Sequence, residues 1–282
     1  MTASLLMKKK SAKPNAKPEF DESLDLLWGN VKAPGPIFLA LEGRAPWEYG
    51  AALASWPLLR NAPTGDGHSV LVFPGLVAGD FSTAPMRNFL NDRGFDAQGW
   101  ELGMNLGPRE GVLETIVAKV QELHKTSGRK VSLVGWSLGG VYAREVAKIL
   151  PNSVRGVISM GTPFCGDPKA TNAWRIYEYA SGTKLDDKKM LASLSTAPPV
   201  PTTSIFSRTD GVVAWQCSVQ IETAKAENIE VIASHVGLGL NPSVWYAVAD
   251  RLAQAEGTWK KFDRTGWKQY VFRDPTRSGN WF

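Results

Sequence analysis

The sequence contains few histidines, few cysteines and no long apolar run. None of its apolar stretches approaches the ~18 residues that a membrane-spanning helix requires, so we expect no such helix. The first residues also lack the order of a secretory signal, because Lys8, Lys9 and Lys10 follow a short apolar stretch instead of preceding a longer one. We therefore expect a cytoplasmic protein.

The two cysteines of this 282-residue chain do not make a disulfide framework. We expect Cys165 and Cys217 to be buried thiols in a reducing compartment, and a single bridge between them is the alternative. The sequence also shows no cluster of residues with the spacing of metal ligands. We therefore expect an activity that needs neither a metal nor an organic cofactor.

Acidic residues are missing from positions 1–18, which hold five lysines. Without these five, the 32 basic residues fall to 27 and equal the 27 acidic ones, so the formal net charge of +5 belongs to the tail. The sequence therefore predicts no nucleic-acid-binding face on the folded part. Residues 1–20 are predicted to be a disordered basic tail, and weak contact with an anionic membrane surface is the alternative.

The rest of the chain divides into a leader and one large domain. Residues 21–64 are rich in tryptophan, leucine and proline, and we expect this leader to pack on a catalytic domain formed by residues 65–282. Apolar runs predict strands, and helical spacing of apolar residues predicts helices. The expected strands are 69–73, 95–102, 130–134, 154–160, 201–207 and 230–233, and the expected helices are 84–91, 110–124, 138–150 and one that begins at Pro242.

Alternating strands and helices predict an α/β fold with a mostly parallel central sheet flanked by helices. Residues 165–199 interrupt this alternation. We interpret them as a helical cap inserted over the site, and an ordinary pair of crossover helices is the alternative.

The motif with the clearest chemical meaning is the G-x-S-x-G pentapeptide from Gly135 to Gly139. It lies between an expected strand and an expected helix, a context in which a sharp turn exposes the serine hydroxyl as a nucleophile. The alternative is a glycine-rich loop of any α/β protein. The context favours Ser137 as the nucleophile of an acyl-transfer site.

A serine needs a base to take its proton, and the base needs an orienting carboxylate. On such turns the acid and then the histidine follow the serine along the chain. Only one of the three histidines, His235, follows Ser137, so we expect His68 and His124 to be solvated. Asp210 is the favoured acid because it follows an expected strand, although Asp-Gly is also a common turn. The full set of candidate acids between Ser137 and His235 includes Asp167, Asp186, Asp187, Asp210 and Glu222.

Acyl transfer also needs hydrogen-bond donors for the oxyanion. The backbone N–H of Leu138, the residue after the nucleophile, is one expected donor. The N–H of Leu76 is the other, because it lies in the loop after an earlier strand, and Pro74 in that loop has no N–H to give. Trp136, Phe164 and Trp215 indicate an apolar acyl pocket, with a place in the core as the alternative.

These segments together resemble the α/β-hydrolase superfamily, in particular bacterial esterases and lipases. The resemblance covers residues 69–252 and is carried by Pro74-Gly75-Leu76, Gly135-Trp136-Ser137-Leu138-Gly139-Gly140, Gly161-Thr162-Pro163, Ser207-Arg208-Thr209-Asp210-Gly211 and Ser234-His235-Val236-Gly237-Leu238. Many lipases carry His-Gly where this chain has Pro74-Gly75, so a hydrogen bond from that histidine cannot form here.

The resemblance implies hydrolysis of a small-molecule ester with a hydrophobic acyl group. Ser137, Asp210 and His235 would then form the catalytic triad. An acyltransferase or thioesterase with the same triad is an alternative, and so is a non-catalytic binding module on the same scaffold.

Overall fold

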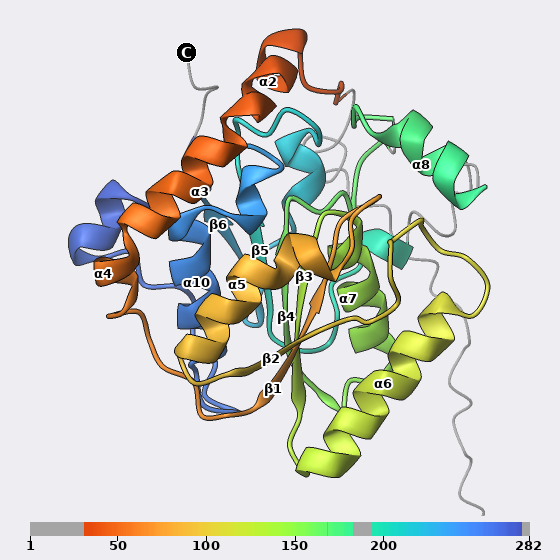
Figure 1. Ribbon diagram of the computed structural model, residues 1–282, viewed down its shortest axis with the longest axis vertical. Helices are drawn as coiled ribbons and strands as arrows, with labels where there is room; N and C mark the ends of the chain where they lie inside the picture. Colours follow the sequence, from red (N-terminus) through yellow and green to blue (C-terminus); the bar gives the residue numbers. More distant parts are fainter. Residues whose placement is uncertain (1–30, 168, 183–192, 278–282) are drawn as a thin grey trace, which may run out of the picture.

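The protein is built around one parallel β-sheet of six strands in the order β2-β1-β3-β4-β5-β6 (Figure 1). The computed structural model describes residues 31–167, 169–182 and 193–277, so the predicted tail and part of the predicted cap lie outside the described residues. Every neighbouring pair of strands is parallel, which confirms the predicted fold class. The strands are β1 (Ser69–Phe73), β2 (Asp96–Gly99), β3 (Val131–Trp136), β4 (Val154–Met160), β5 (Thr202–Phe206) and β6 (Ala226–Glu230).

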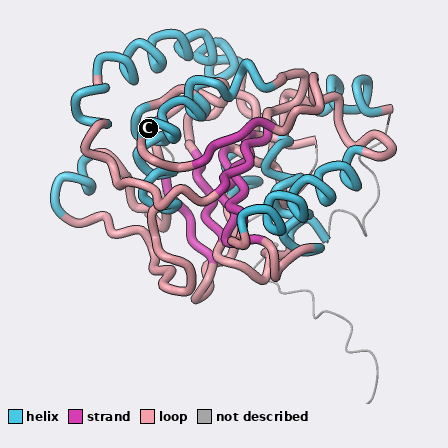
Figure 2. The backbone as a smooth tube through the Cα atoms, turned by 60° about the horizontal axis from the view of Figure 1, so that its bottom comes forward, coloured by secondary structure: helices cyan, strands magenta, loops and turns pink. Residues whose placement is uncertain are grey.

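The central strands are apolar because both faces of the sheet are covered. In β1, Val70 and Val72 point into one apolar cluster, and Leu71 and Phe73 point into a second cluster on the opposite face. Figure 2 shows the strands between helices that lie on both sides. A run of apolar residues without alternation is therefore what this sheet requires.

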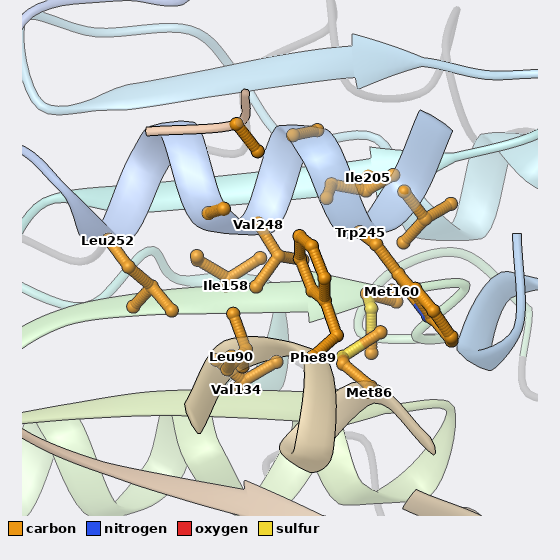
Figure 3. Close-up of a cluster of buried hydrophobic side chains, with 14 of the residues drawn as sticks. Met86, Phe89, Leu90, Val134, Ile158, Met160, Ile205, Trp245, Val248 and Leu252 are labelled. Carbon is orange, nitrogen blue, oxygen red and sulfur yellow. The ribbon is translucent and has the colours of Figure 1, made fainter. Parts of the chain in front are cut away.

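Four long helices cover the two faces. Residues of α5 (Asp80–Asp92) and α10 (Pro242–Leu252) belong to the first cluster, and residues of α6 (Val112–Ser127) and α7 (Leu138–Ile149) belong to the second. Figure 3 shows the centre of the first cluster, where Phe89 of α5 stacks on Trp245 of α10 with ring centroids 5.4 Å apart. This stacked pair lies where the two helices meet over the sheet.

The N-terminal segment adds an outer layer of short helices on the side of α5 and α10 (Figure 1). It consists of α2 (Pro36–Ala40), η1 (Leu41–Arg44), α3 (Ala45–Ala54) and α4 (Trp56–Leu59). Ala52 and Leu59 are buried in the first cluster, and Trp56 meets Phe89 edge-on with ring centroids 6.1 Å apart. α3 and α4 therefore pack against the first cluster.

The predicted strand at 230–233 is wrong. β6 ends at Glu230, where its pairing with Phe206 at the end of β5 also ends, and residues 231–234 form no strand. Val231 and Ala233 lie in a loop but are buried. Burial requires apolar residues at these positions, and an apolar run predicts a strand. The strand predicted at 95–102 covers only Asp96–Gly99 in the structure. Beyond β2 the amides of Trp100 and Glu101 donate to the carboxylate of Asp80 and not to a neighbouring strand.

Candidate active site

Ser137 occupies a strained turn between β3 and α7. Its backbone has φ +53° and ψ −123°, a conformation that costs a residue with a side chain of the order of 1–3 kcal/mol. The flanking glycines permit the turn, because a Cβ on Gly139 would lie 2.4 Å from the carbonyl oxygen of Phe73. A Cβ on Gly135 would lie 2.4 Å from the backbone of Gly140. The turn therefore holds the serine at the carboxyl-terminal edge of the sheet.

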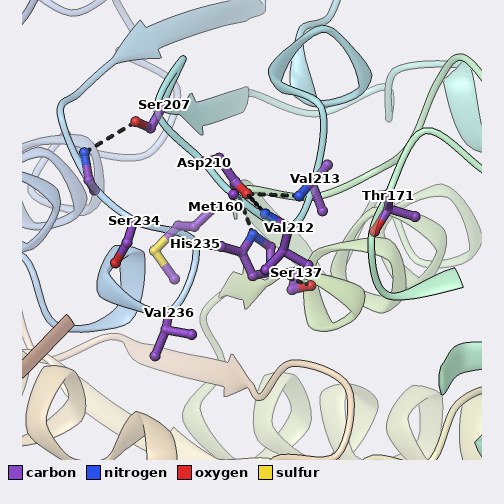
Figure 4. Close-up of polar contacts among 12 residues, drawn as sticks. Ser137, Met160, Thr171, Ser207, Asp210, Val212, Val213, Ser234, His235 and Val236 are labelled. Atoms are coloured by element: carbon purple, nitrogen blue, oxygen red, sulfur yellow. Dashed lines mark hydrogen bonds and ion pairs between the residues drawn. The ribbon is translucent and has the colours of Figure 1, made fainter. Parts of the chain in front are cut away.

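The structure brings Ser137, Asp210 and His235 together (Figure 4). His235 Nε2 lies 3.0 Å from Ser137 Oγ, and His235 Nδ1 lies 2.7 Å from Asp210 Oδ2. The other carboxylate oxygen of Asp210 accepts hydrogen bonds of 2.8 Å from the amides of Val212 and Val213. Because Nδ1–H donates to Asp210, Nε2 is left to accept the serine proton.

Burial makes the electrostatics of this group strong, since Asp210 is 4% exposed and His235 is 5% exposed. Burial by itself lowers the pKa of His235. The charge of Asp210, its hydrogen bond and the charge of Glu42 act in the opposite direction, and together they raise the pKa of His235 above its ordinary value of 6.5. The imidazolium form is therefore stabilised at the place where a general base would take a proton.

The Gly161-Thr162-Pro163 segment passes directly beside this pair. Gly161 has φ +55°, and a Cβ there would lie 3.1 Å from Asp210 Oδ2, 3.1 Å from His235 Nδ1 and 2.5 Å from the side chain of Leu238. Only glycine combines this conformation with this close approach. The motif therefore leaves room for the Asp210–His235 contact.

The loop after β1 lies against the turn that carries Ser137, since a Cβ on Gly75 would lie 3.4 Å from the Cβ of Ser137. Leu76, Leu138 and Ser137 all line the same cavity. Leu138 is the first residue of α7, so its N–H has no acceptor within the helix, and the positive end of the helix dipole lies there. A negative charge beside Ser137 would be stabilised by this arrangement.

Sequence reasoning missed Asn105, which holds the loop after β1 in place. This residue is fully buried, and its side-chain amide donates to the carbonyl oxygen of Pro74 across 2.8 Å. The backbone carbonyl oxygen of Asn105 accepts a 2.7 Å hydrogen bond from the amide of Val77. A single asparagine in an irregular loop gives no sequence signal of this role.

An apolar cavity of about 370 Å³ opens beside Ser137. It lies between α7 and the segment that carries α8 (Trp174–Ser181). Most of its lining is aliphatic, aromatic or proline. The lining residues are Leu76, Pro108, Leu113, Ser137, Leu138, Val141, Tyr142, Glu145, Pro163, Phe164, Cys165, Gly166, Thr171, Ala173, Trp174, Tyr177, Ser193, Leu194 and Val213.

Of the three aromatic residues predicted for the pocket, Phe164 lines this cavity, and Trp136 and Trp215 do not. Trp136 shares a face of β3 with Val134 and packs in the first apolar cluster, on the other side of the sheet from α7. Its indole N–H donates to the carbonyl oxygen of His235 across 3.0 Å. Trp215 stacks on Phe206 instead, with ring centroids 5.7 Å apart.

Comparison with known proteins identifies the fold. The sequence matches no protein-family model and no curated protein. Among solved structures, Aspergillus fumigatus lipase B aligns with 70% of this chain at 18% identity and a TM-score of 0.53. One of the metagenome-derived lipolytic enzymes LipS and LipT aligns with 67% of this chain at 14% identity and a TM-score of 0.51. Bacillus licheniformis lipase BlEst2 in its mature form aligns with 69% of this chain at 17% identity and a TM-score of 0.50.

The chain has the α/β-hydrolase fold. The matched region spans 56% of the fungal lipase, 93% of the metagenome-derived enzyme and 95% of the Bacillus lipase. At these identities the likeness establishes the fold, and the resemblance read from the sequence is confirmed at that level.

The structure also answers two predictions, one about His68 and one about the two cysteines. His68 is not solvated: it is fully buried, and its ring contacts Asp66 at 2.6 Å and Ser132 at 2.9 Å. Cys165 and Cys217 are buried free thiols rather than a disulfide. Burial raises the pKa of Cys217 to about 12, so its thiolate form is negligible at neutral pH.

Neither a metal cluster nor a membrane-spanning helix is found in the parts of the chain that the structure describes. Within residues 31–167, 169–182 and 193–277, no three His, Cys, Asp or Glu side chains converge to hold a metal ion. In the same ranges, no helix has the length and apolar character needed to cross a membrane.

Proposed function

We propose that this chain is a serine hydrolase that cleaves carboxylic esters through an acyl-enzyme. The observation that carries the proposal is the continuous set of contacts from Ser137 Oγ to His235 at 3.0 Å and from His235 to Asp210 at 2.7 Å, at the mouth of an apolar cavity. A buried serine–histidine–carboxylate arrangement activates a hydroxyl that is otherwise a weak nucleophile.

In the first half-reaction Ser137 Oγ attacks the ester carbonyl while His235 Nε2 takes the hydroxyl proton. Asp210 holds the imidazole in the required tautomer and stabilises the imidazolium. The oxyanion of the tetrahedral intermediate is bound by the N–H groups of Leu76 and Leu138. When the intermediate collapses, His235 gives its proton to the departing alcohol, and the acyl group remains on the serine.

In the second half-reaction a water molecule attacks the acyl-enzyme, and His235 takes one of its protons. The same backbone amides bind the second oxyanion. When this intermediate collapses, the bond between the acyl carbon and Ser137 Oγ breaks, His235 returns its proton to Oγ, and the acid is released. The donors are part of the backbone and need no rearrangement, which favours both steps equally.

The substrate class follows from the cavity. A space of about 370 Å³ with an apolar lining suits a hydrophobic acyl chain of a small-molecule ester. Each buried methylene contributes ~0.8 kcal/mol, which is about fourfold in kcat/KM until the cavity is full. We therefore expect kcat/KM to rise along a p-nitrophenyl ester series from two carbons toward medium chains. A sharp optimum at acetate would exclude this cavity as the acyl site and would leave the esterase assignment intact.

The assignment of Ser137 is tested by Ser137→Ala together with a fluorophosphonate probe. We expect kcat to fall about 10⁴- to 10⁶-fold with the fold intact, and labelling to disappear. Ser127→Ala, an exposed serine at the end of α6, is the matched control and should keep both activity and labelling. Near-wild-type hydrolysis by Ser137→Ala would refute the proposal. A product assay with added alcohol completes the test, since a dominant transesterified product would identify an acyltransferase.

A further inference from the structure

Glu42 connects the two loops that carry the acid and the histidine. Glu42 belongs to η1 in the N-terminal layer, 193 positions before His235. Its Oε1 accepts hydrogen bonds from the amide of Gly211 at 2.7 Å and from the amide of His235 at 2.8 Å. Its Oε2 accepts a third hydrogen bond of 2.9 Å from the amide of Val236. One carboxylate thus bonds to the residue after Asp210, to His235 itself and to its successor.

Two neighbours of Glu42 contact the same loops. Glu48 of α3 accepts a 2.8 Å hydrogen bond from the amide of Ser234, the residue before His235. Arg44 pairs with Glu48 at 2.9 Å and donates to Thr209 Oγ1 at 2.7 Å, next to Asp210. The segment 42–48 therefore contacts residues on both sides of the acid and of the histidine.

The fit between this segment and the loops is close. A Cβ on Gly211 would lie 2.2 Å from the carbonyl oxygen of Phe38, and a Cβ on Gly237 would lie 1.8 Å from Glu48 Oε2. Gly211 therefore cannot carry a side chain without a shift of the backbone at Phe38, and a side chain at position 237 would displace the Glu48 carboxylate. Neither glycine lines the proposed substrate cavity. The loops are shaped to receive the N-terminal layer.

We propose that Glu42 is a positioning residue, which fixes the backbone of His235 relative to Asp210 and so holds the imidazole in line with Ser137. The inference rests on the proposed function, since it assigns a role toward the general base. Charge-assisted hydrogen bonds to a carboxylate are shorter and more directional than neutral ones, which suits them to set the geometry of a loop. Misplacement of a reacting group by about 1 Å can cost about 100-fold in rate.

The charge of Glu42 gives the proposal a signature that a purely structural contact would lack. The charged groups around His235 are Asp210 from the loop after β5, Glu42 from η1, and the paired Glu48 and Arg44. Burial lowers the pKa of His235, and the charges of Asp210 and Glu42 raise it, with a net increase. Removal of the Glu42 charge should therefore lower the pKa of His235 and move the acidic limb of kcat/KM to lower pH.

Two variants separate charge from geometry. Glu42→Gln keeps one oxygen for the amides of Gly211 and His235 but loses the charge and the acceptor for the Val236 amide, so we expect a small loss of kcat and a shift of the acidic limb to lower pH. Glu42→Ala loses all three hydrogen bonds, and we expect kcat to fall about 10- to 100-fold with little change in KM. Glu256→Gln is the matched control, because Glu256 is exposed and pairs with Lys130 before β3, at the opposite edge of the sheet.

The role of Glu42 can be measured without ester hydrolysis, so it can be tested separately from the proposed function. The chain has three histidines, so an NMR titration can follow the imidazole of His235 with His68 and His124 as references. Hydrogen exchange of the His235 and Val236 amides reports the same contact. If wild-type protein neither hydrolyses esters nor labels at Ser137, the function fails, while the titration and exchange still test Glu42.

The proposal is supported if Glu42→Gln lowers the titration midpoint of His235 and Glu42→Ala accelerates amide exchange at His235 and Val236. It is overturned if both variants keep the wild-type midpoint and exchange rates. It is also overturned if activity falls equally in both variants with an unmoved acidic limb. Should Glu42→Ala fail to fold, Glu42→Gln alone decides through the midpoint of His235.

Discussion

The side-chain amide of Asn105 and the carbonyl oxygen of Pro74 form a 2.8 Å hydrogen bond in the interior of the protein. The backbone of Asn105 also accepts from Val77 and donates to Ala78, so one residue makes three contacts with the loop after β1. Pro74 and Gly75 turn that loop toward Ser137, and a Cβ on Gly75 would lie 3.4 Å from the serine Cβ. Asn105 thus supports the proposed oxyanion site from behind.

The first prediction concerns Asn105→Ala. The loop loses its side-chain anchor, so the Leu76 donor shifts and kcat should fall about 10- to 100-fold with KM nearly unchanged, less than the loss of a whole oxyanion donor. The unpaired carbonyl of Pro74 should lower the free energy of unfolding by about 1–3 kcal/mol. Steady-state kinetics and urea unfolding measure both effects, with the exposed Asn61→Ala as control. An unchanged kcat would show that the loop keeps its geometry without this anchor.

A second prediction concerns Asp210→Asn and the pH profile. In wild-type protein the pKa of His235 is raised, so the acidic limb of kcat/KM should have its midpoint above pH 6.5. The substitution removes the main charge that raises this pKa and favours the wrong tautomer. We expect kcat to fall about 10⁴-fold and the limb to move to lower pH. Asp274→Asn, at an exposed turn, should leave the profile unchanged. A limb that stays in place would mean that another group controls the titration.

The third prediction tests the cavity. Val141 lies on α7 one turn after Ser137 and lines the apolar space. Val141→Phe fills part of that space, so kcat/KM for long acyl chains should fall about 10-fold while acetate hydrolysis stays near the wild-type value. The p-nitrophenyl ester series measures the shift. If the variant slows all chain lengths equally, the acyl chain binds elsewhere.

A fourth prediction concerns stability and His68. Burial lowers the pKa of His68 below 6.5, with the charge of Arg155 in the same direction, and the contact with Asp66 offsets this only in part. Because the unfolded chain then binds the proton more tightly, the stability that His68 contributes is complete above pH 6.5 and is lost as the pH falls from 6.5 through the folded-state pKa. In urea unfolding, the free energy of unfolding should decrease less between pH 6.5 and the folded-state pKa in His68→Gln than in wild type. The partly exposed His124 supplies the control, His124→Gln. If the free energy of unfolding depends on pH equally in wild type and in His68→Gln, His68 does not cause this pH dependence.

Much of the fold is predictable because the parallel sheet is buried on both faces. Continuous apolar runs therefore mark strands well, and the predicted strand at 154–160 coincides with β4. Strand ends are harder, since they depend on the partner strand: β6 begins at Ala226 because β5 offers partners from Thr202 onward. The run 231–233 resembles a strand because it is apolar, but after the 3.0 Å hydrogen bond from the Val231 amide to Phe206 the ladder ends, and Ile232 is exposed.

The same reasoning explains which site residues could be predicted. Ser137 and His235 follow from a motif and from chain order, which are properties of the sequence. Trp136 takes the core position that was the alternative to the pocket, since the strand pleat turns its side chain to the face with Val134. Glu42 and Asn105 bond mainly to backbone amides and carbonyls, and such partners leave no mark on the sequence.

The bond between Glu42 and the amide of His235 also has a consequence for folding. The two residues are 193 positions apart, and parallel strands pair only after long crossovers have closed. Contacts of such high contact order form slowly, because loop-closure entropy must be overcome first. On refolding from urea, helix content should therefore recover before ester hydrolysis, and activity should return together with the docking of the N-terminal layer.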